Sequence, residues 1–106
     1  MVNQELFGKT GIKQCVIQEI IHLAQKYDVQ KVILFGSRAR GDYKLKSDID
    51  LAIYSNSDIF EFIEEVENTT HTLLEFDFSD MNKVKDDFFI EQIKKDGIII
   101  YEKCRI

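Results

Sequence analysis

Asp48 and Asp50 stand two positions apart in a segment, residues 48–54, where polar and apolar residues alternate. Such alternation is typical of a half-buried β-strand, in which residues i and i+2 lie on the same face with Cα atoms roughly 6.5–7 Å apart. Two carboxylates at this spacing can converge on one or two divalent cations, and Mg²⁺ favours a few carboxylates combined with phosphate oxygens of a substrate. The pair therefore predicts a metal site on one face of a sheet.

A third carboxylate comes from a later apolar segment. Asp77 lies between Phe76 and Phe78, and Glu75 shares its face by alternation, so strand geometry does not separate the two acids. Aspartate is disfavoured inside strands, and three acids on one sheet face repel one another unless a cation compensates their charge. Because such costs tend to be tolerated at functional sites, the pattern favours a metal site over an ordinary solvated strand face.

The second chemical feature is a short turn, residues 36–41, directly after an apolar run. Gly36 lets the backbone turn sharply and lets a ligand approach without a Cβ in the way. Ser37 stands where a short helix could begin, so its hydroxyl and the following N–H groups predict a phosphate-binding turn. Arg38 and Arg40 add charge-assisted donors for the same anion, although arginines here are equally compatible with packing or with partner binding.

The order Gly36-Ser37, ten intervening residues, Asp48-x-Asp50 and then Asp77 resembles the nucleotidyltransferase superfold of DNA polymerase β. The chain looks most like the minimal nucleotidyltransferases, many of which are the antitoxin halves of HEPN–nucleotidyltransferase pairs. The resemblance implies that Gly36 and Ser37 hold the β- and γ-phosphates of an NTP. It further implies that Asp48 and Asp50 bind two Mg²⁺ ions and that Asp77 completes the shell of the catalytic ion.

Within this family the resemblance suggests transfer of AMP from ATP to a tyrosine of a HEPN-domain RNase toxin, which silences the toxin. One alternative is a non-catalytic antitoxin that covers its partner's active site, although a pure binding module has no physical reason to keep three carboxylates. Another is a transferase that acts on a small molecule such as an aminoglycoside. Those enzymes usually need a further helical domain, and 106 residues leave no room for one.

The elements that must position these residues follow from hydrophobic periodicity. Helical spacing of apolar residues predicts helices, and short alternating or β-branched runs predict strands. We expect helices over residues 11–27, 58–66 and 82–95 and strands over residues 31–35, 48–54, 74–78 and 98–101. The fold class is therefore α/β, as one domain over residues 1–106, with a small mixed sheet, helices on one face and the aspartates on the other, open face.

Charge and composition limit the remaining possibilities. The net charge of −5 argues against broad nucleic-acid binding. Five basic residues in residues 31–46 suggest a basic lip for a polyanion, whereas residues 47–82 hold ten acids and no Lys or Arg. The apolar runs are too short to span a membrane, no signal peptide precedes the domain, and two unpaired cysteines, Cys15 and Cys104, suit a reducing compartment. We expect a cytoplasmic protein whose homo- or hetero-oligomeric state stays open.

Overall fold

The structure is a computed structural model that describes residues 9–103. The expectations for the first seven residues and for Cys104 lie outside the described residues. Cys15 is an exposed free thiol. No helix in the described part of the chain is both long and apolar enough to cross a membrane.

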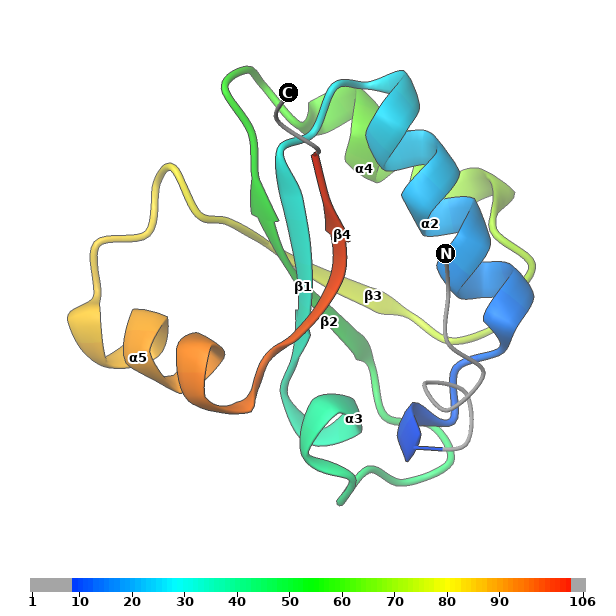
Figure 1. The fold of residues 1–106 in the computed structure, drawn as a ribbon. Helices are drawn as coiled ribbons and strands as arrows, with labels where there is room; N and C mark the ends of the chain where they lie inside the picture. Colours follow the sequence, from blue (N-terminus) through cyan, green and yellow to red (C-terminus); the bar gives the residue numbers. More distant parts are fainter. Residues whose placement is uncertain (1–8, 104–106) are drawn as a thin grey trace.

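In the part of the chain that the structure describes, four strands form one mixed sheet, and the helices α2 to α5 accompany it (Figure 1). Along the chain the elements are α2 (Gln14–Lys26), β1 (Lys31–Phe35), α3 (Ser37–Arg40), β2 (Ile49–Tyr54), α4 (Phe60–Thr69), β3 (Phe76–Asp80), α5 (Asp87–Asp96) and β4 (Ile98–Glu102). The predicted strands all occur, with the third two residues later than expected. The first and third predicted helices begin later than expected, at Gln14 and Asp87.

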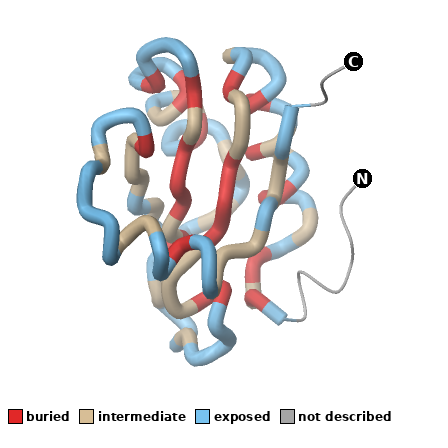
Figure 2. Tube along the Cα trace, turned by 60° about the vertical axis from the view of Figure 1, so that its left-hand side comes forward, coloured by how far each residue is buried: buried red, intermediate tan, exposed pale blue. Residues whose placement is uncertain are grey.

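The strand order is β3-β2-β1-β4. β1 pairs antiparallel with β2 and with β4, whereas β2 and β3 run parallel because α4 connects them as a crossover. The excursion between β1 and β2 is too short for a crossover helix of normal length, which accounts for their antiparallel pairing. The central strands β1 and β2 hold most of the buried residues of the sheet, and the edge strands β3 and β4 are partly exposed (Figure 2).

The main core lies between one sheet face and the helices α2 and α4. Alternating residues of β2 point to this side, and the buried side chains of α2 and α4 pack against them. Residues on a strand two positions apart share a face, so the residues between them, Asp50 among these, must point to the other face. The core residues of β1 and β2 on the helix side are Val32, Leu34, Ile49, Leu51 and Ile53.

The second face is not fully open, which corrects the expectation that all helices lie on one face. α5 lies across the sheet from α2 and α4 (Figure 1), and its Ile93 packs with Ile33 and Ala52 in a smaller apolar cluster. The ring of Phe89 also meets Phe35 edge-on, with centroids 5.4 Å apart. α5 therefore shields the apolar side chains on this face of β1 from solvent over part of the sheet.

Gly97, which follows α5, has extended backbone, with φ −70° and ψ 148°. Glycine is required here because there is no space for a side chain, and not because of the backbone conformation. A Cβ at Gly97 would lie 2.3 Å from the carbonyl oxygen of Ile93 and 2.6 Å from a methyl group of Ile33. The glycine therefore lets the chain leave α5 and enter β4 in close contact with the sheet.

Candidate active site

The glycine turn and the first carboxylates meet at one end of the sheet. β1 ends at Phe35, and Gly36 adopts φ +76°, a left-handed conformation that glycine accepts without strain. A Cβ at Gly36 would lie 2.1 Å from Oδ2 of Asp50. The carboxylate of Asp50 therefore rests against the backbone of the turn, and no other residue type leaves room for it there.

Ser37 opens the single-turn helix α3, which ends at Gly41 with φ +96°. Within α3 the N–H of Arg40 donates to the carbonyl of Gly36 and the N–H of Gly41 to that of Ser37. The first N–H groups of a helix have no acceptor within the helix, so this turn presents its early amides beside the carboxylate of Asp50.

Two aspartates share the sheet face that points away from α2 and α4, and a third lies just before the strand that carries one of them. Asp50 and Asp77 are paired residues of the parallel strands β2 and β3, so their side chains share a face, and Asp48 immediately precedes β2. Partial burial, together with the negative charges of Asp77 and Asp48, raises the pKa of Asp50 to about 6, against a smaller opposing effect of Arg40. The repulsion between carboxylates that the sequence predicted is therefore evident at Asp50, whose charged form is disfavoured.

The geometry distinguishes the two acids that alternation left open. Asp77 lies inside β3, opposite Asp50, and its charge acts on that carboxylate. Glu75 precedes β3, and it lines a separate hollow with Glu67 and Leu73. This placement supports Asp77 as the third carboxylate, an assignment that stays a prediction.

Arg38 does not occupy the position that phosphate binding requires. It is only 1% exposed, and its guanidinium donates to the carbonyls of Ser47 and Thr10 at 2.9 Å each and of Leu45 at 3.2 Å. It also lies 4.7 Å from the ring centre of Tyr43. The expectation that Arg38 contacts the nucleotide does not fit this placement, because its donors hold the loop that leads into Asp48.

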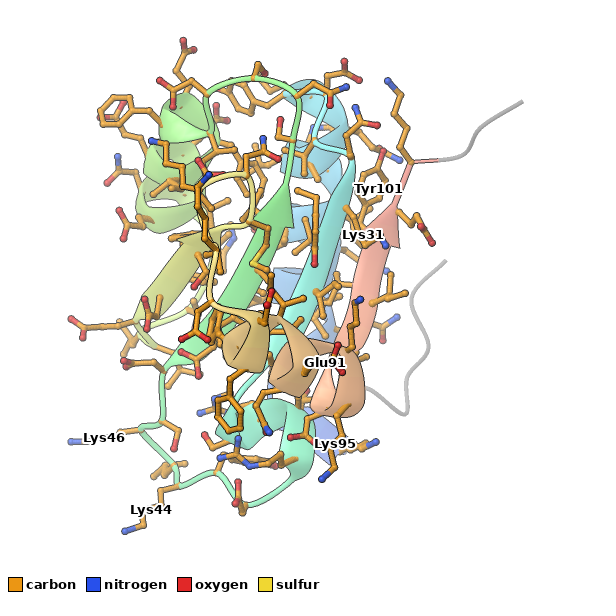
Figure 3. All side chains as sticks on the ribbon, turned by 90° about the vertical axis from the view of Figure 1, so that its left-hand side faces the viewer. Lys31, Lys44, Lys46, Glu91, Lys95 and Tyr101 are labelled. Atoms are coloured by element: carbon orange, nitrogen blue, oxygen red, sulfur yellow. The ribbon has the colours of Figure 1, made fainter. Side chains whose placement is uncertain are left out.

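Arg40 is the arginine of the turn whose side chain remains available to contact a phosphate. Its side chain is 46% exposed, its Nε lies 3.4 Å from Oδ2 of Asp42, and its charge acts on Asp50. The expected basic lip is smaller than the sequence suggested, because Lys31 lies at the opposite end of β1, paired with Glu102 at 3.5 Å. Lys44 and Lys46 stay exposed and extend away from the molecule on the loop before Asp48 (Figure 3).

Neither turn composition nor spacing indicated which arginine would be buried. The carbonyls that accept from Arg38 belong to Thr10 and to the loop of residues 44–47, and backbone carbonyls carry no sequence signal.

In the described residues no three His, Cys, Asp or Glu side chains are close enough to form a ready-made metal site. The donor chemistry nevertheless suits a hard cation that takes oxygen ligands and keeps open positions for phosphate. Nearby carboxylates without a cation repel one another, so a looser arrangement is the expected geometry before such an ion binds. Asp48, Asp50 and Asp77 are the residues that would hold it.

Comparison with known proteins places this arrangement in a family. The family described as "Polymerase beta, Nucleotidyltransferase" matches residues 18–106. The chain belongs to the polymerase β nucleotidyltransferase family. This match covers all four strands, the glycine turn and the three aspartates, and enzymes of this family generally use a divalent metal.

A relative from Methanocaldococcus jannaschii, named "Putative protein adenylyltransferase", is 41% identical over 63 residues, which are 57% of this chain and 60% of the relative. The chain thus spans less than two thirds of that protein's length. A chain in a crystal structure of a toxin–antitoxin complex with AMP-PNP superposes with a TM-score of 0.67 at 21% identity, over 82% of this chain and 73% of the other. A chain in the complex of a tri-AMPylated Shewanella oneidensis HEPN toxin with its MNT antitoxin gives 0.63 at 19% identity, over 87% and 74%.

At these low identities the two structural matches establish the fold. Over the superposed parts, those two chains and this one share the same fold.

Proposed function

We propose that this protein is an adenylyltransferase that moves AMP from ATP to a hydroxyl of an acceptor protein. The observation that carries the proposal is the contact between the Gly36 turn and Asp50, with Asp48 and Asp77 beside it. A turn for phosphates and a set of carboxylates for a cation have to be adjacent if one Mg²⁺-bound triphosphate is to engage both. Adjacency of these two features has no evident role in stability, because the carboxylates repel one another.

Each residue has a role in this scheme. Gly36 and Ser37 hold the β- and γ-phosphates, and Arg40 adds positive charge at the same end of the sheet. Asp48 and Asp50 hold two Mg²⁺ ions, which when bound neutralise the triphosphate and the charge that develops in the displacement. Asp77 accepts the proton of the attacking hydroxyl while the new oxygen–phosphorus bond forms at the α-phosphate and the bond to pyrophosphate breaks.

The acceptor we propose is a tyrosine of a HEPN-domain RNase toxin, which makes the protein an antitoxin. The support comes from the M. jannaschii relative named for protein adenylyl transfer and from the AMPylated HEPN toxin found with an MNT antitoxin of the same fold. The site itself favours a large acceptor, because the aspartates lie on a partly open sheet face that a second protein can cover. A cytoplasmic location, expected from the sequence, stays a prediction.

Thermal unfolding with Mg²⁺ and each of the four NTPs tests the nucleotide site. A ligand at a hundredfold excess over its Kd stabilises the folded state by about 2.7 kcal/mol, which is several degrees for a domain of this size. We expect Mg²⁺–ATP to raise the Tm of the wild type but not that of an Asp48→Asn, Asp50→Asn double variant. If no nucleotide shifts the wild type, even with its partner present, inhibition by binding alone replaces the catalytic proposal.

Transfer of labelled AMP to the partner toxin tests the chemistry and the choice of third carboxylate. Asp77→Asn should abolish transfer while Mg²⁺–ATP binding persists, because the base is lost and two metal ligands remain. Glu75→Gln is the matched control and should keep transfer close to the wild-type level. The opposite result would assign the base to Glu75.

A further inference from the structure

β3 is an edge strand of the sheet, and among residues 9–103 no strand pairs with the side of its backbone that faces away from β2. Its pairing with β2 is bounded by the bond from the N–H of Ile49 to the carbonyl of Glu75 and by that from the N–H of Met81 to the carbonyl of Ile53. Backbone groups of successive strand residues point to opposite sides, so the odd-numbered residues of β3 bond to β2. The N–H and C=O groups of Phe76 and Phe78 therefore point away from β2, toward the outer edge of the sheet.

Asp77 lies between these two residues, and its carboxylate is on the active face. In an added antiparallel strand the residue opposite Asp77 would form a non-hydrogen-bonded pair, the closer kind, with Cα atoms about 4.5 Å apart. Its side chain would project on the same face as Asp77, with Cβ atoms about 4.5–5.5 Å apart. A hydroxyl-bearing residue at this position would be delivered directly to the proposed base.

Beside the beginning of β3 lies a hollow of about 490 Å³. Leu73, which is fully exposed, lines it together with Leu74 and Phe76 on the side of the strand that faces α4. Residues of an added strand next to the one opposite Asp77 would point to this side, because neighbouring strand residues alternate between faces. The hollow thus offers apolar contact to the side chains that flank the acceptor residue.

The surroundings of this edge are acidic. Residues 47–82 contain ten Asp or Glu and no Lys or Arg. Glu67 of α4 and Glu75 line the hollow, both exposed, and neither has a Lys or Arg at ion-pair distance among the described residues. An approaching chain therefore gains attraction from positive charge and meets repulsion if it is acidic.

We propose that the free edge of β3 binds an extended, basic, hydroxyl-bearing segment of the acceptor protein by strand addition. The inference rests on the proposed function and names the acceptor site for it. The added strand places the hydroxyl of its central residue by Asp77. The oxygen then attacks the α-phosphorus of ATP, its proton passes to Asp77, and pyrophosphate leaves.

Amide hydrogen exchange measured by NMR tests strand addition directly. The probe is a nine-residue peptide with tyrosine at the centre and valine and lysine alternating on both sides, with lysine at the ends. In the free protein the amides of Phe76 and Phe78 should exchange quickly, and saturating peptide should slow both by about tenfold or more. If the exchange rates of both amides stay the same at saturating peptide, whether or not the peptide binds elsewhere, the proposal is overturned. It is also overturned if the amides of the protein alone become protected as the protein concentration rises, since a second copy would then occupy the edge.

Two matched peptides test the register. N-methylation of the valines beside the tyrosine removes donors that point to β3 and should weaken binding by about tenfold or more, whereas N-methylation of the tyrosine removes a donor that points away. Equal effects of the two modifications would contradict strand addition. A peptide with glutamate in place of each lysine should bind more weakly than the parent, and equal binding would contradict the charge argument.

Glu67→Lys and Glu64→Lys form a matched pair of protein variants, since both residues are exposed on α4 but only Glu67 lines the hollow. Glu67→Lys should weaken peptide binding severalfold and Glu64→Lys should not, while both keep the Mg²⁺–ATP shift in Tm. If Mg²⁺–ATP gives no shift at all, the proposed function fails. If the shift and transfer persist and these variants and peptides make no difference, only the acceptor site at β3 is refuted.

Discussion

Replacing Asp50 with asparagine should stabilise the metal-free protein at neutral pH. Burial and the charges of Asp77 and Asp48 raise the pKa of Asp50 from 3.8 to about 6, so its ionised form is disfavoured in the folded state. Asparagine has nearly the same shape and carries no charge. It therefore removes the desolvation and the repulsion while it keeps the contact with Gly36.

The size of the effect follows from linkage. Because the pKa of Asp50 is higher in the folded state than in the unfolded state, its contribution to stability is fully present below pH 3.8. This contribution is lost as the pH rises through about 6, and it does not change further above that pH. The shift of about two units corresponds to about 3 kcal/mol at 1.36 kcal/mol per unit, taken without screening. Because Asp50 is partly exposed, water screens its repulsion, and we expect about 1–2 kcal/mol.

Urea unfolding in EDTA at pH 4 to 8 measures the difference in free energy of unfolding between the wild type and the Asp50→Asn variant. The variant should match the wild type closely at pH 4 and gain its full advantage by pH 7, and saturating Mg²⁺ with ATP should reverse the order. Glu91→Gln, which removes an exposed carboxylate on α5, is the control and should change stability little at any pH. An Asp50→Asn variant that is less stable than the wild type at pH 8 without metal, or equally shifted at pH 4 and pH 8, would refute the reasoning.

Three further substitutions probe how the site is held. Gly36→Ala should destabilise the fold by about 1–2 kcal/mol, since φ is +76° and the new Cβ collides with Asp50, and calorimetry should find Mg²⁺–ATP binding lost. Arg38→Ala should cost about 3 kcal/mol or more in urea unfolding, because buried carbonyls lose their donors, and Arg38→Lys should recover only part of that. Gly97→Ala should lower the free energy of unfolding by about 1–3 kcal/mol, because the Cβ meets the carbonyl of Ile93, and a value near zero would show that the end of α5 can shift.

Much of the fold followed from local patterns. The alternation over residues 48–54 predicted β2 and placed Asp48 and Asp50 on one face of the sheet. The boundaries of α5 did not follow, because apolar spacing over residues 82–95 does not show where hydrogen bonding begins. The structure begins that helix only after Asp86, whose carboxylate accepts from the N–H groups of Phe88 and Phe89.

The sequence by itself determined the family, the glycine turn and the two aspartates of β2, because these features depend on residue type and spacing within about a dozen positions. Only the tertiary structure decided which partners those residues meet. The parallel crossover brings Asp77 opposite Asp50, the fold of the loop buries Arg38 among carbonyls, and packing sets α5 on the face of the aspartates. Contacts between distant segments depend on how the layers pack, and the side chains alone carry no local signal for that choice.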